Sequence, residues 1–245
     1  LSSQGSLFGG SESKGLSKPK VSEVAPYGEI EKLNIEKDLV GLYISGHPLD
    51  KYQFEMRFLT KGKISDLKDL TLVNGRMFRI GGIITQVQHR MTKKGRPFGQ
   101  FTFEDYSDSY TFFLFSDTYL KFKSYLEVGW FLSLSGSVQN RWKSEELEFK
   151  ISNIEYLGDI REKAIKGLEI QVNLKDISDN IIVELEKLGE EFPGNCMVKL
   201  NIYDRHEDRM INVEMISRIM TIDPNYALIK KIESMVDLRY KVLLN

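Results

Sequence analysis

The sequence predicts an α+β protein, mostly β, with two structured modules. The first observation is a succession of five short strand-like segments within residues 76–157, with one helical segment between the third and the fourth. The second is the order strand–helix–strand–strand–helix–strand from residue 167 onward, in which residues 197–203 and 210–216 alternate apolar and polar side chains. A chain of 245 residues is long enough to give each module its own core.

The first module has the element order of an OB-fold, a small five-stranded Greek-key barrel. Gly81 and Gly82 permit a bend in its long first strand, and its third strand is rich in strand-forming aromatic residues. We expect strands at residues 77–89, 98–104, 110–115, 131–138 and 147–157, and the helix at 116–125. The sheet is expected to close into a barrel, which would leave no exposed edge, with the helix plugging one end.

The second module matches the split βαβ, ferredoxin-like plan in the order of its elements. Four segments are therefore expected along the chain. They are a flexible arm at residues 1–28, a helical linker at 29–72, the OB-fold domain at 73–158 and a small α/β domain at 159–245. The arm is rich in Ser, Gly, Lys and Pro, and it cannot bury enough apolar surface to offset the entropy lost on ordering.

The two loops with which OB barrels commonly bind oligonucleotides are both cationic here. Cations can follow a phosphate backbone, and an aromatic plane can stack on a base. The candidate nucleic-acid contacts are Arg79, Arg90, Lys93, Lys94, Arg96, Phe98, Arg141, Trp142 and Lys143. Charged hairpin loops are also ordinary solvated turns, so the residue types alone leave both interpretations open. Phe113 is a further candidate for stacking, although a place in the core is the favoured expectation.

The composition excludes a globally basic nucleic-acid binder. The formal net charge is −1, so any affinity for DNA must come from local patches and should depend on salt. The single cysteine, Cys196, suits a reducing cytoplasm, and no apolar run approaches the length of a membrane span. The sequence starts with Leu1 rather than Met, which is compatible with a piece of a longer protein.

The sequence shows no set of nucleophile, base and metal ligands, which disfavours a free-standing enzyme. His47 precedes Pro48 and is expected to cap a turn. Asp105, Asp108 and Asp117 fall in predicted turns and helix caps, where we expect structural roles. One short pattern in the arm stands apart: a glutamine followed closely by a Leu-Phe pair can anchor a disordered segment in an apolar pocket. Its residues are Gln4, Ser6, Leu7 and Phe8. Chance apolar pairs are common in linkers, so the residue types alone favour an ordinary linker over an anchor.

Residues 41–50 read Gly-Leu-Tyr-Ile-Ser-Gly-His-Pro-Leu-Asp, a distinctive string. It closely resembles the segment that precedes the OB domain in the alpha (catalytic) subunit of bacterial DNA polymerase III. Further resemblances follow in the same order along nearly the whole chain. Lys93-Lys94-Gly95 resembles the basic first barrel loop of that family. Glu104-Asp105 and Leu114-Phe115 resemble its second and third strands. The module from Gly167, including Pro193-Gly194, resembles its carboxyl-terminal domain.

The resemblance implies the non-catalytic C-terminal region of a replicative polymerase. The parent would be a DNA-directed DNA polymerase, a nucleotidyltransferase whose palm-domain aspartates hold Mg²⁺, and no cofactor is expected in this chain. The implied partners are single-stranded template DNA on the OB-fold, the beta sliding clamp on the arm and the tau subunit of the clamp loader on the C-terminal domain. Gln4 would clasp the rim of the clamp pocket, and Leu7 and Phe8 would enter it, while Gly5 departs from the usual motif.

No motif assigns the residues that contact tau, and residues 219–245 are the expected segment only by their position. The alternative function is a protein-interaction module whose barrel binds no nucleic acid, because OB-folds host unrelated functions.

Overall fold

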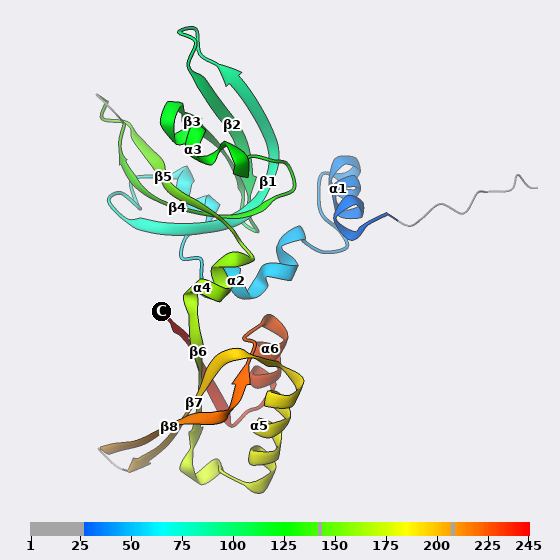
Figure 1. Ribbon diagram of the computed structural model, residues 1–245, viewed down its shortest axis with the longest axis vertical. Helices are drawn as coiled ribbons and strands as arrows, with labels where there is room; N and C mark the ends of the chain where they lie inside the picture. The colour runs from blue at the N-terminus through cyan, green and yellow to red at the C-terminus, as the bar shows by residue number, and fades with distance from the viewer. Residues whose placement is uncertain (1–26, 142–143, 207–208) are drawn as a thin grey trace, which may run out of the picture. The chain divides into compact units, whose positions relative to one another are not determined.

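The computed structural model of the chain describes residues 27–141, 144–206 and 209–245 (Figure 1). It divides into two compact units, Leu1–Ser45 and Gly46–Asn245, and each is considered by itself. The division falls inside the predicted linker. The predicted clamp-binding residues Gln4, Ser6, Leu7 and Phe8 lie outside the described residues.

The first unit contains helix α1 (Glu29–Val40). The helix ends at Gly41, whose φ of 82° is a left-handed conformation that glycine adopts without strain. The backbone N–H of Gly41 donates to the carbonyl oxygen of Lys37 at 2.8 Å. The following turn is held by Glu36, whose carboxylate accepts hydrogen bonds from the backbone N–H groups of Ile44 and Ser45.

The Gly-His-Pro-Leu-Asp string forms the entry to the second unit. His47 caps η1 (Pro48–Tyr52), as expected: its Nδ1 accepts from the backbone N–H of Leu49 at 3.1 Å, and Asp50 accepts from the backbone N–H of His47 at 2.7 Å. The side chain of Leu49 is fully buried. The capped turn and the buried Leu49 therefore fix the start of the second unit in place. Helix α2 (Gln53–Phe58) and η2 (Ile64–Lys68) follow, and the first strand of the barrel comes after them.

The first sheet has the five strands and the helix in the predicted order. They are β1 (Met77–Met91), β2 (Pro97–Glu104), β3 (Ser109–Phe115), α3 (Ser116–Phe122), η3 (Lys123–Tyr125), β4 (Phe131–Asn140) and β5 (Leu147–Tyr156). Strand β1 is long enough to pair with β4 through its first half and with β2 through its second half. Gly82 marks the crossing, because a Cβ atom there would lie 2.4 Å from the carbonyl oxygen of Glu104.

The expectation that the barrel closes without edges is wrong. The sheet order is β3-β2-β1-β4-β5, and in the described part of the chain no ladder joins β3 to β5. Side chains close the core at this point instead, with the rings of Phe112 and Phe149 at a centroid distance of 6.0 Å. Phe122 and Leu126, on α3 and just beyond η3, are buried against the same core. The OB-fold is therefore partly open between β3 and β5.

The C-terminal module follows α4 (Asp159–Ala164) and has the predicted order of strands and helices. Its elements are β6 (Ile165–Asn173), η4 (Leu174–Asp176), α5 (Asp179–Glu191), β7 (Pro193–His206), β8 (Arg209–Ile222), α6 (Tyr226–Ser234) and β9 (Leu238–Leu244). The strand pairing differs from the split plan. In the order β8-β7-β6-β9, β6 pairs directly and in parallel with β7, so the first three elements form a simple βαβ unit.

Helices α5 and α6 lie on the same side of this sheet (Figure 1). Ser178 and Asn225 cap their N-termini with side-chain oxygens. Leu188 of α5 and Ile232 of α6 are buried, as are Leu168 and Ile170 of β6. Among the described residues, no helix combines the length and the apolar character needed to cross a membrane.

Candidate nucleic-acid interface

The tip of the β1–β2 hairpin presents the first group of predicted contacts. Thr92 closes the turn: its backbone N–H donates to the carbonyl oxygen of Arg96 at 2.8 Å, and its Oγ1 accepts from the backbone N–H of Arg96 at 3.0 Å. Gly95, with a φ of 72°, supplies the left-handed residue that the turn requires. Lys93 and Lys94 are thereby held in solvent at the end of a hydrogen-bonded ribbon.

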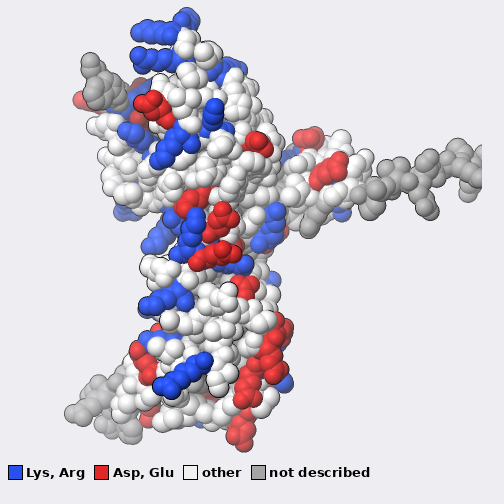
Figure 2. Space-filling view, viewed as in Figure 1, with Lys and Arg blue, Asp and Glu red and all other residues white. Residues whose placement is uncertain are grey.

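Four cations gather at this hairpin, and Figure 2 shows Lys and Arg side chains over its tip. Arg90, Lys93, Lys94 and Arg96 are all exposed. In the described part of the chain none of the four has a carboxylate within ion-pair distance. Cations without carboxylate partners keep their full charge for a polyanion, so this patch attracts phosphate although the whole chain is near neutrality.

An aromatic ladder adjoins the cations on the outer face of the sheet. We use this name for Phe98, Phe113 and Phe115. Phe98 stands opposite Phe115 in the β2–β3 register and opposite Arg90 in the β1–β2 register. The rings of Phe98 and Phe115 stack with centroids 5.4 Å apart, and those of Phe115 and Phe113 with centroids 6.2 Å apart. The ladder therefore places three aromatic rings side by side on the outer face, and Phe113 and Phe115 are about half exposed.

The preferred expectation that Phe113 lies in the core is wrong. Phe113 is 52% exposed and Phe115 is 48% exposed, whereas Phe112 and Leu114 are buried. Neighbouring residues in a strand point to opposite faces, so the burial of Phe112 and Leu114 sends Phe113 and Phe115 outward. Phe115 was missed as a candidate in the sequence. The signal available for it was its spacing of two residues from Phe113.

A groove of about 480 Å³ runs along the opening between β3 and β5. Phe113 and Phe115 line one wall, and Arg141 and Lys150 belong to the other. Arg141 differs from the hairpin cations because its guanidinium lies 3.6 Å from the carboxylate of Glu146. Trp142 and Lys143, the remaining candidates on this loop, lie outside the described residues.

Arg79 does not join this surface. It lies eleven residues before Arg90 on β1, a separation of roughly 35 Å along an extended strand. Its guanidinium donates to Ser135 Oγ at 3.3 Å and lies 3.8 Å from the carboxylate of Glu155. The structure therefore groups Arg90, Lys93, Lys94, Arg96 and Phe98, and it leaves Arg79 in a separate, ion-paired setting.

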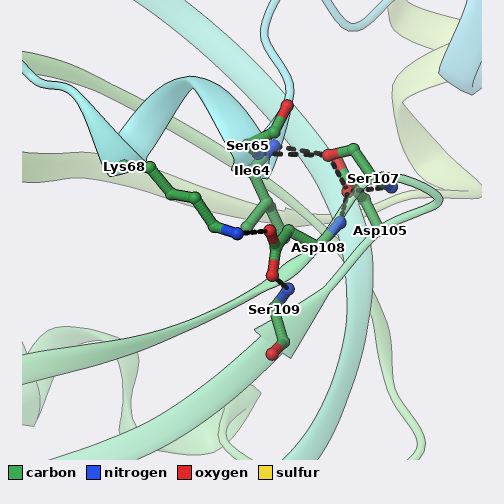
Figure 3. Close-up of polar contacts among 7 residues, drawn as sticks. All are labelled: Ile64, Ser65, Lys68, Asp105, Ser107, Asp108 and Ser109. Atoms are coloured by element: carbon green, nitrogen blue, oxygen red, sulfur yellow. Dashed lines mark hydrogen bonds and ion pairs between the residues drawn. The ribbon is translucent and has the colours of Figure 1, made fainter.

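The carboxylates of the β2–β3 turn organise backbone, as expected (Figure 3). Asp105 is buried and accepts four hydrogen bonds, from the backbone N–H groups of Ile64, Ser107 and Asp108 and from Ser107 Oγ, at 2.6–3.0 Å. Asp108 forms an ion pair with Lys68, and the hydrogen bond from this lysine lowers the pKa of Asp108. These contacts hold η2 against the turn. The carboxylate oxygens of Asp105 are used in hydrogen bonds that stabilise the fold.

Two family comparisons cover most of the second unit. Residues 168–243 match the family described as "DNA polymerase III alpha subunit, C-terminal domain". Residues 78–157 match the family described as "OB-fold nucleic acid binding domain". The C-terminal module is therefore similar to the C-terminal domain of the DNA polymerase III alpha subunit. The two matched ranges correspond to the two sheets. The hairpin cations and the aromatic ladder lie in residues 78–157, the range that matches the OB-fold family.

Curated DNA polymerase III alpha subunits align with much of this chain. The subunit of Pseudomonas fluorescens is 27% identical over 170 residues, which are 69% of this chain and 14% of that protein. The subunit of Haemophilus influenzae is 27% identical over 178 residues, which are 73% of this chain and 15% of that protein. The subunit of Thermus aquaticus is 26% identical over 189 residues, or 76% and 15%. The chain thus matches about one seventh of the length of these alpha subunits.

Two solved structures match about one third of this chain. The second OB-fold domain of replication protein A from Methanococcus maripaludis is 16% identical, with a TM-score of 0.24 and coverage of 34% of this chain and 85% of that chain. A small single-stranded DNA-binding protein from Streptomyces coelicolor is 17% identical, with a TM-score of 0.22 and coverage of 34% and 93%.

Proposed function

We propose that this chain is a non-catalytic C-terminal region of a replicative DNA polymerase and that its OB-fold binds single-stranded template DNA. The observation that carries the proposal is the aromatic ladder beside the four hairpin cations. Leaving large aromatic side chains half in water forgoes about 1 kcal/mol or more of burial for each. A ligand whose bases stack on the rings recovers that free energy.

The geometry favours a single strand over a duplex. Stacking on Phe113 and Phe115 requires bases whose faces are free, and in a duplex these faces are occupied by neighbouring base pairs. The cations at the hairpin tip can hold the phosphates of the same strand while its bases reach the ladder, because Arg90 and Phe98 are direct neighbours across β1 and β2.

The test is a comparison of two oligonucleotides of equal length, one single-stranded and one duplex, by fluorescence anisotropy with the whole chain. We expect the single strand to bind at least about tenfold more tightly, since stacking on one base contributes about 1–3 kcal/mol. Equal affinity for both forms would point to phosphate contacts alone. No binding of either form would favour the alternative, a barrel that serves protein interaction.

We also propose two protein partners. The arm would bind the beta sliding clamp through Gln4, Ser6, Leu7 and Phe8, which is supported by the Gln-x-x-Leu-Phe form of the motif. The C-terminal module would bind the tau protein of the clamp loader, which is supported by the match of this module to the C-terminal domain of the alpha subunit.

A clamp pull-down with a Leu7→Ala, Phe8→Ala variant tests the clamp as a partner, and retained binding would overturn it. Immobilised tau tests the second, and a failure of the chain to bind it would overturn that partner.

A further inference from the structure

Strands β7 and β8 form a ribbon with one apolar and one polar face. Leu200 pairs with Met215 and Ile202 pairs with Val213, so these four side chains share one face. The opposite face carries Asn201 and Tyr203 of β7 and, across from them, Glu214 and Asn212 of β8. Such alternation normally marks a strand pair that buries its apolar face.

The β8 half of this apolar face is exposed, whereas Leu200 and Ile202 of β7 are half-buried. Ile211, Val213 and Met215 are 60%, 52% and 43% exposed. Helix α5 packs on β8 closer to its other end, where Gly189 approaches the side chain of Met220. Strand β8 is also an edge of the sheet, so it has backbone groups available for a partner. A contiguous apolar patch on an edge ribbon is typical of a protein-binding surface.

The negative charge of helix α5 indicates which kind of partner segment the ribbon would bind. Helix α5 carries five acidic residues and one lysine, and Figure 2 shows acidic side chains as a ridge along it. Glu186 and Glu190 of this ridge are exposed, and so are the apolar side chains of Ile182 and Val183 on the same helix. An acidic and apolar surface repels a nucleic acid and attracts a segment that is apolar and basic.

We propose that the apolar face of the β7–β8 ribbon, together with the acidic ridge of α5, binds an amphipathic protein segment that carries apolar and basic side chains. This inference rests on the proposed function, because it specifies the surface with which the C-terminal module binds its protein partner. The surface differs from the segment expected by position, residues 219–245. In that segment Leu228 and Ile232 are buried inside the module, whereas Ile219 and Val236 are 97% and 95% exposed.

The test compares two variants that remove apolar surface without changing charge. The ribbon variant is Val213→Thr with Met215→Thr, and the matched control is Val236→Thr on the loop before β9. Each is measured with two probes, the purified tau protein and a synthetic amphipathic helix of leucine and lysine. Circular dichroism confirms that each variant is folded.

We expect the ribbon variant to lose about tenfold in affinity for both probes, which corresponds to about 1.4 kcal/mol of lost apolar contact. The control should stay within about twofold. A Glu186→Gln, Glu190→Gln variant should bind more weakly and with less dependence on salt. If the wild-type chain does not bind tau but the leucine–lysine helix still depends on the ribbon, the tau partner fails and the surface stands. An unchanged affinity of the ribbon variant for the leucine–lysine helix, or a larger loss with Val236→Thr, overturns the inference.

Discussion

Phe113 lies nearly parallel to Phe115, with ring centroids 6.2 Å apart and ring planes inclined by 9°, on the outer face of strand β3. The two side chains are exposed, while Phe112 and Leu114 between and beside them are buried. One strand thus supplies the core with one set of apolar residues and the surface with another. Substitutions on the two faces of β3 should separate these two roles.

Replacing Phe113 or Phe115 with Ala should weaken binding of single-stranded DNA without unfolding the barrel. Each substitution removes a stacking face, so the expected loss is about 1–3 kcal/mol, measured by fluorescence anisotropy. Phe112→Ala is the matched control on the same strand. It should lower the free energy of unfolding by about 3–5 kcal/mol in urea titrations, because it leaves a cavity in the core. An effect of Phe113→Ala on stability as large as that of Phe112→Ala would contradict the assignment of faces.

Arg96 and Arg141 should contribute differently to DNA binding. Arg96 has no carboxylate partner in the described part of the chain, whereas the guanidinium of Arg141 lies 3.6 Å from Glu146. Arg96→Ala should therefore reduce oligonucleotide affinity more than Arg141→Ala does, and Glu146→Ala should increase it about twofold by releasing Arg141. Anisotropy titrations of the three variants at low salt check the order. Weaker binding by Glu146→Ala would show that this carboxylate supports the site.

Asp105→Ala should destabilise the OB-fold strongly. It leaves three backbone N–H groups without their acceptor, among them the N–H of Ile64, which is bonded at 2.8 Å. The hydrogen bond to Ile64 is buried, whereas those to Ser107 and Asp108 are partly exposed to water. One unsatisfied buried group costs about 1–3 kcal/mol, so a loss in that range is expected in urea unfolding. Asp117→Ala, at an exposed position in the first turn of α3, is the control and should cost less than about 1 kcal/mol.

The stability of the second unit should depend on pH through Glu55. Burial raises the pKa of this carboxyl, and the guanidinium of Arg161, 3.6 Å away, offsets the effect only in part. The folded state therefore holds the proton more tightly than the unfolded state. The Glu55 contribution to the free energy of unfolding should fall as the pH rises from about 4.5 through the raised pKa. Urea unfolding at several pH values should show this decline in the wild type and its loss in Glu55→Gln. A wild-type stability that rises across this range, relative to Glu55→Gln, would contradict the direction of the pKa change.

The succession of strands and helices could be predicted from the sequence because it depends on local patterns. The alternation in residues 98–104 fixes β2, and Gly81 and Gly82 mark the bend of β1. The positions of the hairpin cations followed from the same pattern, because a turn between two alternating strands places its residues in solvent.

Pairing between distant strands could not be predicted in the same way. Whether β3 meets β5 depends on the packing of side chains such as Phe112 and Phe149, which are far apart in sequence. The pairing of β6 with β7 also joins segments that are separated in sequence. The outward position of Phe113 was missed for a related reason. Both faces of β3 are apolar, so alternation separates its residues into two sets without showing which set is inside.

The most direct test of the central claim is the salt dependence of single-stranded oligonucleotide binding, measured for the wild type and for a Lys93→Ala, Lys94→Ala, Arg96→Ala variant. About four phosphate contacts on a single strand predict a slope of roughly −3 in a plot of log affinity against log salt concentration, and the variant should retain a slope of roughly −1. A slope near zero in the wild type, or an equal slope in the variant, would contradict the claim that these cations hold a polyanion.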